Sequence, residues 1–369
     1  MAGCNLAVPE RDRSDPMRLL VTGVAGFIGS NFVYSWLSRH SSDEIIGLDN
    51  LTYAGNLHNL QSLPLDQKKR FTFVKGDIGD SGKVQEILGD NPVDRIVNFA
   101  AESHVDRSIR DPQVFLRSNI LGTANLLDAA RVAWKKGEDL LPGKKFLQIS
   151  TDEVYGSLGP TGYFTENTPL DPHSPYSASK ASADLLVKAY HDTYGMPILI
   201  TRCSNNYGPY QFPEKLIPLM IDNALHHQPL PVYGDGRQIR DWLYVEDHCR
   251  AIECVLESGK LGEVYNIGGN NERYNIDIVK FILTALRQET GDPDINESLI
   301  RHVKDRPGHD RRYAIDSTKI QTELGWKPMI SFEEGIHTTI RWYLDHHDWM
   351  QQVMSDEYLK FNEEHYLKM

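Results

Sequence analysis

Short apolar runs alternate with amphipathic stretches along the N-terminal part of the chain. The runs, among them RLLVTG, EIIGLD, RIVNFAA and PILITR, are short and continuous, which is typical of strands buried on both faces of a sheet. The stretches between them, such as FVYSWL and YSASKASADLLVKAY, carry apolar residues at helical spacing. This regular alternation of strand and helix predicts an α/β fold with a Rossmann-like, doubly wound parallel sheet.

The alternation ends after Arg202, where a segment rich in proline, glycine and asparagine begins, SNNYGPYQFPEKLIP. Shorter elements follow, which predict a smaller C-terminal α+β domain over the carboxyl ends of the strands, where ligands of such sheets bind. We expect the cofactor-binding domain over residues 17–204, with return elements at about residues 238–270. The substrate-binding domain is expected over residues 205–237 and 271–350.

Composition and charge exclude several classes of protein. The 369 residues include 39 Lys and Arg against 51 Asp and Glu, a net charge of −12 without a dense basic block, so we expect no nucleic-acid partner. No apolar run approaches the roughly 18 residues that span a bilayer, so we expect no membrane partner. The four cysteines contain no Cys-x-x-Cys pair, which predicts reduced thiols, no metal site and a cytoplasmic location. Residues 1–16 carry mixed charges, two prolines and no apolar run, so we expect a disordered extension there.

Three glycines mark the turn between the first predicted strand and the first predicted helix. Gly23, Gly26 and Gly29 stand where backbone N–H groups at a helix N-terminus can approach a pyrophosphate, although a glycine turn alone also occurs without a ligand. Asp49 follows Gly29 by 20 residues, at the end of the next strand, where a carboxylate bonds an adenosine ribose. Because a carboxylate there repels a 2′-phosphate, the pair predicts NAD rather than NADP.

Other strand ends complete the predicted cofactor site. Asn50 and Thr52 follow Asp49, and Asp77-Ile78 would lie beside the adenine. The segment from Ala100 to His104 would flank the pyrophosphate and the nicotinamide, although His104 could instead be a capping or loop histidine.

Tyr176 and Lys180 stand four residues apart at the start of a predicted helix, so they share one face. A nearby ammonium and the positive charge of a nicotinamide both favour the phenolate and lower the pKa of the phenol. The pair therefore predicts a base that takes a proton from an alcohol during hydride transfer.

Thr151, Asp152 and Glu153 follow the strand KFLQIS. Alcohol oxidation needs only a hydroxyl such as that of Thr151, so the two carboxyls indicate a second reaction. Both can serve one substrate only if the strand ends and the chain curls at Asp152. In a dry pocket, repulsion and desolvation would leave one carboxyl protonated and the other ionised. A solvated turn without chemistry is the alternative.

Several of these motifs occur together in one family. TGVAGFIG, LDNLTYAGN, AAESHVDRSI, STDEVYG, PYSASKA and GRQIRDWLYVEDH are present, together with the more specific SNNYGPYQFPEKLIP and DRPGHDRRY. From about Met17 to Tyr343 the chain resembles the dTDP-glucose 4,6-dehydratases, which are extended short-chain dehydrogenases/reductases. The resemblance implies a homodimer formed through a four-helix bundle, with the helices around residues 115–131 and 176–194 as candidates.

The resemblance also implies roles for the catalytic residues. Tyr176, beside Lys180, would take the proton of the 4-hydroxyl as hydride passes to NAD⁺, and Thr151 would bond the same oxygen. Glu153 would take the proton from carbon 5, and Asp152 would protonate the 6-hydroxyl so that it leaves as water.

The same resemblance implies two sets of binding residues. The NAD site would comprise Gly23, Gly26, Phe27, Ile28, Gly29, Asp49, Asn50, Leu51, Thr52, Asp77, Ile78, Phe99, Ala100, Ala101, Ser103, Ser118, Tyr176, Lys180 and Asn205. The nucleotide-sugar site would comprise Ser103, His104, Thr151, Asn206, Lys215, Leu216, Pro231, Tyr233, Arg240, Asn275, Asp305, Arg306 and His309. Lys215 and Arg240 suit the diphosphate. Val24 and Asn50 depart from the family pattern, which has Gly and Lys more often at these two positions.

Four other functions compete with this interpretation. A UDP-hexose 4-epimerase needs Tyr176, Lys180 and NAD but no acid pair, and a GDP-mannose 4,6-dehydratase prefers NADP, which Asp49 disfavours. A non-catalytic NAD sensor would tend to lose Tyr176 or Lys180. A UDP-glucose 4,6-dehydratase stays open, because one methyl group in a pocket is worth only about 1 to 3 kcal/mol.

Overall fold

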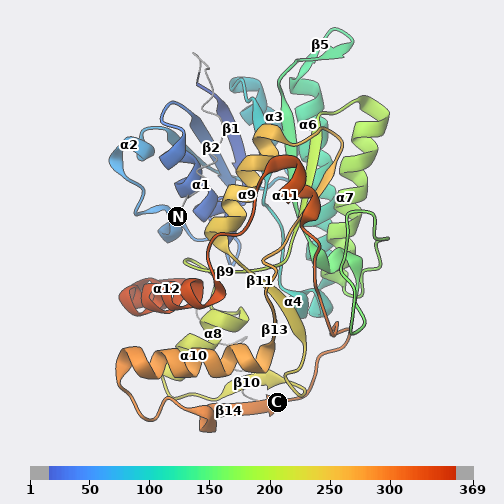
Figure 1. Cartoon of the computed structure of the whole chain (residues 1–369). Coiled ribbons are helices and arrows are strands. Elements are labelled where there is room, and N and C mark those ends of the chain that lie inside the picture. Colours follow the sequence, from blue (N-terminus) through green and yellow to red (C-terminus); the bar gives the residue numbers. More distant parts are fainter. Residues whose placement is uncertain (1–15, 355–369) are drawn as a thin grey trace, which may run out of the picture.

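The computed structural model describes residues 16–354 (Figure 1). Apart from Pro16, the extension expected over residues 1–16 lies outside the described residues. Within the described part, no helix is long and apolar enough to cross a membrane.

A parallel sheet of seven strands forms the centre of the upper part of Figure 1. Its order is β12-β8-β7-β4-β1-β2-β3, and every pairing is parallel. Successive strands are added to one side of β1 up to β3 and to the other side from β4 onward, so the strand order reverses between β1 and β4, the point where ligands of doubly wound sheets bind. The predicted Rossmann-like fold is confirmed. The strands are β1 (Arg18–Thr22), β2 (Glu44–Asp49), β3 (Phe71–Lys75), β4 (Arg95–Asn98), β7 (Lys145–Thr151), β8 (Ile198–Cys203) and β12 (Val264–Ile267).

Helices cover both faces of this sheet. One face packs against α1 (Phe27–Arg39), α9 (Val245–Ser258) and α11 (Thr318–Leu324). The other face packs against α3 (Ser81–Asp90), α6 (Thr123–Ala133) and α7 (Pro175–Tyr194).

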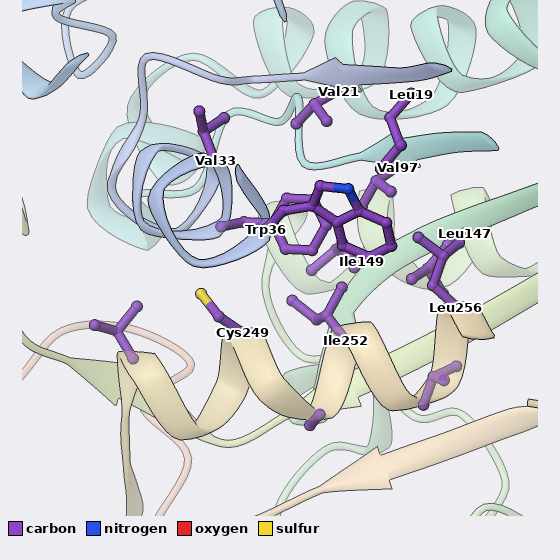
Figure 2. Close-up of a cluster of buried hydrophobic side chains, with 14 of the residues drawn as sticks. Leu19, Val21, Val33, Trp36, Val97, Leu147, Ile149, Cys249, Ile252 and Leu256 are labelled. Carbon is purple, nitrogen blue, oxygen red and sulfur yellow. The ribbon is translucent and has the colours of Figure 1, made fainter. Parts of the chain in front are cut away.

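The apolar contacts across the first face explain the predicted buried strands. Figure 2 shows Trp36 of α1 lying between side chains of the sheet and those of Ile252 and Cys249 on α9. The indole N–H of Trp36 donates a hydrogen bond to Asp43 Oδ2 at 3.2 Å. Burial of each large apolar side chain contributes about 1.5 to 3 kcal/mol to folding. Because helices cover both faces of the sheet, the strands can be apolar on both faces.

A second group of elements packs around its own apolar core below the central sheet in Figure 1. A three-stranded sheet of order β13-β11-β9 and a parallel pair, β10 with β14, belong to this region. The chain then returns through α9 to β12, which joins the edge of the central sheet beside β8. The strands are β9 (Asn205–Tyr207), β10 (Leu230–Tyr233), β11 (Ile239–Tyr244), β13 (Glu272–Tyr274) and β14 (Ile300–Val303), and the helices are α8 (Leu216–Leu225), α10 (Asn275–Thr290), α12 (Phe332–Asp345) and α13 (His347–Val353).

Short elements connect these layers. Next to the site, α4 (Val105–Arg110) and α5 (Pro112–Phe115) lead into a π-helix, η2 (Leu116–Gly122), which continues as α6. The 3₁₀ helix η3 (Asp152–Tyr155) follows β7 directly. The remaining elements are η1 (Leu57–Leu60), α2 (Leu65–Lys68), β5 (Lys135–Lys136), β6 (Asp139–Leu140) and η4 (Glu297–Leu299).

Candidate active site

The glycine turn between β1 and α1 permits two close backbone approaches. Gly23 has φ +67°, and a Cβ added there would lie 2.6 Å from the Ala100 amide nitrogen. A Cβ on Gly29 would lie 2.2 Å from the carbonyl oxygen of Gly23. No side chain caps the N-terminus of α1 at Gly26, so its first-turn amides are available to an anion.

Asp49 ends β2 beside this turn. Its Oδ2 accepts a hydrogen bond from the Ala25 amide and its Oδ1 accepts one from the Leu51 amide, both at 2.8 Å. Burial raises the pKa of Asp49, and these two N–H groups oppose the shift. Each carboxylate oxygen keeps a lone pair for a further donor such as a ribose hydroxyl.

A cavity of about 820 Å³ opens beside these elements. It brings together most of the cofactor and catalytic residues that the sequence predicts. These are Gly23, Gly26, Phe27, Ile28, Gly29, Asp49, Asn50, Thr52, Asp77, Ile78, Phe99, Ala100, Ala101, Ser103, Ser118, Thr151, Asp152, Glu153, Tyr176, Lys180, Asn205, Asn206 and Lys215. Leu51 is not among the lining residues; it has φ +55°, and its amide holds Asp49.

A second cavity of about 170 Å³ shares Ser103, Glu153, Asn205, Glu214 and Lys215 with the first. Among the residues predicted to bind the nucleotide sugar, it brings together Ser103, His104, Lys215, Leu216, Pro231, Tyr233, Arg240, Asn275, Arg306 and His309. Asp305 is not among the lining residues. Its Oδ1 lies 2.6 Å from His309 Nδ1 and its Oδ2 accepts a hydrogen bond from Gln238, so it supports residues that do line the cavity.

His104 combines the two roles that the sequence left open. Its Nδ1 accepts a hydrogen bond from the Arg107 amide at 3.4 Å as the N-cap of α4, and its side chain lines the second cavity. Burial lowers the pKa of His104 to about 4, so the imidazole is neutral at neutral pH.

Tyr176 and Lys180 lie one turn apart near the start of α7, whose N-terminus is fixed by a capping box between Ser174 and Ser177. The Lys180 ammonium donates to the carbonyl oxygen of Ile149 at 2.7 Å. Burial and the charge of Glu153 raise the pKa of Tyr176 well above its usual range, and a hydrogen bond with Thr151 opposes the shift. The protein groups alone therefore oppose ionisation of the phenol. The expected lowering of the Tyr176 pKa includes the positive charge of a bound nicotinamide, and it stays a prediction.

The strand β7 ends at Thr151 and the 3₁₀ helix η3 begins at Asp152, which confirms the predicted curl of the chain. Thr151 Oγ1 accepts a hydrogen bond from the Glu153 amide at 3.3 Å and caps this turn. As a result, both neighbouring carboxyls line the first cavity instead of lying on opposite faces of a strand.

The two carboxyls lie in different electrostatic environments. Burial and the charges of Glu153 and Asp241 raise the pKa of Asp152 well above its usual range, and Arg240 opposes that shift. Burial also raises the pKa of Glu153, but Arg306, Arg240 and Lys215 oppose that shift. This asymmetry favours a protonated Asp152 beside an ionised Glu153.

The comparisons with known proteins agree with this geometry. A family model described as GDP-mannose 4,6 dehydratase matches residues 20–339. A dTDP-glucose 4,6-dehydratase from Xanthomonas campestris is 56% identical over 344 residues, covering 92% of this chain and 96% of that protein. The chain belongs to the dTDP-glucose 4,6-dehydratase family.

Other dTDP-glucose 4,6-dehydratases extend the match. The enzyme from Salmonella typhimurium is 49% identical over 360 residues, covering 95% of this chain and 99% of that protein. A crystal structure of the enzyme from Streptomyces venezuelae, with NAD bound, is 48% identical with a TM-score of 0.84, covering 92% of this chain and all of that one. A UDP-glucose 4-epimerase from Thermus thermophilus, with NAD, is 29% identical with a TM-score of 0.78, covering 89% of this chain and all of that one. The resemblance inferred from the motifs is confirmed, and the epimerase alternative is not favoured.

Glu214, which none of the predicted sites includes, lines both cavities. Its Oε1 accepts a hydrogen bond from the Tyr53 hydroxyl at 2.9 Å, and its Oε2 accepts one from Arg107 Nε at 3.2 Å. Its place before Lys215 in the PEKLIP motif was an available signal, because a carboxylate adjoins a predicted phosphate-binding cation.

Proposed function

We propose that this protein is an NAD-dependent hydro-lyase that converts dTDP-glucose to dTDP-4-keto-6-deoxyglucose and water. The observation that carries the proposal is the turn at η3, which brings Asp152 and Glu153 into the cavity that also holds Tyr176. Epimerisation or simple oxidation at carbon 4 needs the tyrosine and a nicotinamide cofactor, but it needs no acid pair.

The chain's residues fit NAD. The close approaches at Gly23 and Gly29 leave room for a pyrophosphate against the first turn of α1, and Asp49 is placed to accept from the ribose hydroxyls. When bound, NAD⁺ accepts a hydride from carbon 4 of the sugar and later returns it to carbon 6. The relatives crystallised with NAD support this assignment.

Oxidation requires removal of the proton from the 4-hydroxyl. Tyr176 takes this proton, and the Thr151 hydroxyl, which forms a hydrogen bond with the phenol in the protein without substrate, donates its single proton to the sugar oxygen once the sugar is bound. Because burial and Glu153 oppose ionisation of the phenol, the positive charges of Lys180 and of the oxidised nicotinamide must offset them.

Elimination requires a base at carbon 5 and an acid at carbon 6. Glu153 takes the proton from carbon 5, which the new ketone has made acidic, while the bond from carbon 6 to its oxygen breaks. Asp152 gives its proton to that oxygen, which leaves as water. Glu153 then returns its proton to carbon 5 as hydride reaches carbon 6. Over the whole reaction Tyr176 gains the proton of the 4-hydroxyl and Asp152 loses one proton to the departing water, so the number of protons on the protein does not change.

The second cavity supplies binding groups for the nucleotide sugar. Arg240 is buried there and Arg306 is half-buried, and Lys215 lines both cavities. Guanidinium groups suit a diphosphate because each can donate two parallel hydrogen bonds to phosphate oxygens. The names of the relatives support a dTDP-sugar as substrate.

We also propose a cytoplasmic homodimer. Exposed apolar side chains gather on neighbouring elements, η2, α6 and α7, which pack against one another. Leu121, Val132 and Leu185 are 62%, 66% and 61% exposed, respectively. Large exposed apolar side chains on helices that pack together are typical of an interface between subunits. The free thiols of Cys203, Cys249 and Cys254 fit a reducing compartment.

Incubation with dTDP-glucose, and separately with UDP-glucose, tests the proposed function. Formation of a 4-keto sugar from dTDP-glucose is detected by the absorbance that it develops in alkali. The expected result is a 4-keto-6-deoxy product with dTDP-glucose. Conversion to dTDP-galactose without a keto product would instead support an epimerase.

A further inference from the structure

A cluster of buried polar residues joins the elements that carry the catalytic side chains, and the proposed reaction does not use it. At its centre, Arg202 on β8 donates from Nε to Asp184 Oδ2 at 2.8 Å and from Nη1 to the Tyr155 hydroxyl at 2.9 Å. The Tyr155 hydroxyl donates in turn to Asn266 Oδ1 on β12 at 2.8 Å. All four residues are buried. The cluster therefore connects α7, β8, η3 and β12.

One arm of the cluster reaches the helix that carries the predicted base. Tyr176, Lys180 and Asp184 follow one another at intervals of four residues on α7, so they lie along one face of the helix. The titratable groups that act on Lys180 are Asp184 on its own helix and Cys203 on β8, and from β7 it meets the Ile149 carbonyl. Burial lowers the pKa of Lys180, and the negative charge of Asp184 opposes that shift.

The other arm reaches the turn that carries the acid pair. Tyr155 is the last residue of η3, two residues after Glu153. Its ring stacks on Phe164 with centroids 5.0 Å apart, and Asn266 Nδ2 donates to the Phe164 carbonyl at 3.1 Å. The position of η3 is thus fixed from its C-terminal end as well as by the Thr151 cap at its start.

The register of the sheet places Arg202 on the strand next to β7, one position before the partner of Thr151. Ser150 on β7 pairs with Arg202, and Thr151 pairs with Cys203. A buried ion pair contributes little net stability, because apolar side chains of similar volume would often stabilise the fold as well or better. Removal of one partner, however, leaves an uncompensated buried charge.

We propose that Arg202 is a positioning residue that holds helix α7 and turn η3 in one register, so that the proton acceptor at carbon 4 and the acid pair at carbons 5 and 6 act on one bound sugar. This inference rests on the proposed function. Its consequence is that each arm of the cluster controls a different chemical step. The Asp184 arm supports oxidation through Lys180, and the Tyr155 arm supports elimination through Asp152 and Glu153.

Two conservative substitutions separate the arms. Tyr155→Phe keeps the stacked ring but removes the hydroxyl that joins Arg202 to Asn266. We expect elimination to slow roughly 10- to 100-fold, the effect of a small misplacement of catalytic groups, while the formation of bound NADH stays near wild type. Asp184→Asn keeps the shape but removes the charge beside Lys180. We expect slower formation of NADH and an alkaline limb of its pH profile that moves to lower pH, because Lys180 loses its proton more readily.

Matched controls exist elsewhere in the fold. Tyr265 on β12 is buried, and its hydroxyl accepts from the Lys260 amide and donates to Glu323, both at 3.0 Å. Asp247 on α9 is buried and accepts from the amides of Met329 and Ile330, both at 2.9 Å. Tyr265→Phe and Asp247→Asn lose comparable buried hydrogen bonds, so they control for loss of stability alone.

The experiment follows bound NADH by absorbance and product by the alkali assay in single turnovers of dTDP-glucose, with melting temperatures for all five proteins. Hydrogen–deuterium exchange of the resting proteins reports on the peptide that contains Asp152–Tyr155. We expect faster exchange of that peptide in Tyr155→Phe but not in Tyr265→Phe, and accumulation of NADH in Tyr155→Phe alone.

Unchanged exchange in Tyr155→Phe, or an equal slowing of oxidation and elimination in both tyrosine variants, would overturn the positioning role. A wild-type protein that forms neither NADH nor product from dTDP-glucose would contradict the proposed function instead. The exchange measurement on resting protein tells these failures apart, because it needs no turnover.

Discussion

Gly29 and Gly23 approach so closely that a Cβ on Gly29 would lie 2.2 Å from the Gly23 carbonyl oxygen. The contact is between backbone atoms, so no side chain can move aside to accommodate a methyl group. We predict that Gly29→Ala opens the turn against α1 and loses bound NAD(H), with a stability loss of about 1 to 3 kcal/mol, as is usual for overpacking. The measurement is nucleotide released on denaturation, together with the melting temperature.

Gly89 offers the control for this prediction. It lies on α3, and an added Cβ would meet nothing within 4 Å. Gly89→Ala should retain NAD(H) and be as stable as wild type or more so, because alanine favours a helix. Full NAD(H) content in Gly29→Ala, or recovery of NADP in place of NAD from the wild type, would contradict the assigned cofactor site.

Tyr176 is the predicted proton acceptor at carbon 4. We predict that Tyr176→Phe keeps the fold and binds dTDP-glucose but loses roughly 10²- to 10⁴-fold in turnover, the range for a general base. Lys180→Met should behave similarly, because it removes the positive charge that offsets burial of the phenol. Turnover and substrate binding, measured separately, check this prediction. Robust turnover by Tyr176→Phe would place the base elsewhere.

Asp241 contributes to the raised pKa of Asp152, after burial and Glu153. Its charge is one of the causes that raise the pKa of Asp152, whereas Arg240 opposes that shift. Asp241 itself is buried, accepts hydrogen bonds from the amides of Gly269 and Asn271, and has a pKa raised by burial to about 6, so it is ionised above that pH.

We predict that Asp241→Asn lowers the pKa of Asp152, so the acid loses its proton at lower pH. The alkaline limb of the elimination rate should then move to lower pH, while the acid limb, which reflects ionisation of Glu153, stays in place. Elimination rates across pH, with melting temperatures at each pH, provide the test. An alkaline limb that stays fixed or moves upward would show that Asp241 does not act on Asp152.

The exposed apolar side chains on η2, α6 and α7 predict the dimer surface. We expect Leu185→Asp to convert the protein to a monomer, because burial of a charge at an interface core is costly. Met329 is also exposed, at 70%, but its amide donates to Asp247 on α9, which covers the other face of the sheet, so Met329→Asp should leave the dimer intact. Sedimentation measures the mass of each variant. A monomeric wild type, or a dimeric Leu185→Asp, would contradict the proposed interface.

The parts of the site that follow strand ends could be predicted from the sequence. Gly23, Asp49 and Thr151 each end or follow a strand of the central sheet, and in such sheets the carboxyl ends of the strands meet at one edge. The strand-to-turn change at Asp152 could also be predicted, because only a turn lets two neighbouring carboxyls face one substrate.

The contributions of distant segments could not be predicted in this way. Asp241 and Arg202 act through partners far along the chain, and their spacing carries no local periodicity. Glu214 also has a distant partner, Arg107, and its only signal in the sequence is its position beside Lys215. The direction of the Tyr176 pKa shift also depends on burial, which no motif encodes. The division into two domains stays a prediction, as do the assigned roles of the site residues.

The measurement that tests the central claim most directly separates the steps of the reaction in deuterated water. Asp152→Asn should still oxidise dTDP-glucose and, with Glu153 intact, exchange deuterium into carbon 5 while forming little 6-deoxy product. Glu153→Gln should form some NADH but neither exchange nor eliminate. Each substitution should cost roughly 10² to 10⁴ in product formation. If both variants form the 6-deoxy product at near wild-type rates, the two carboxyls are a solvated turn and the dehydratase mechanism assigned here is wrong.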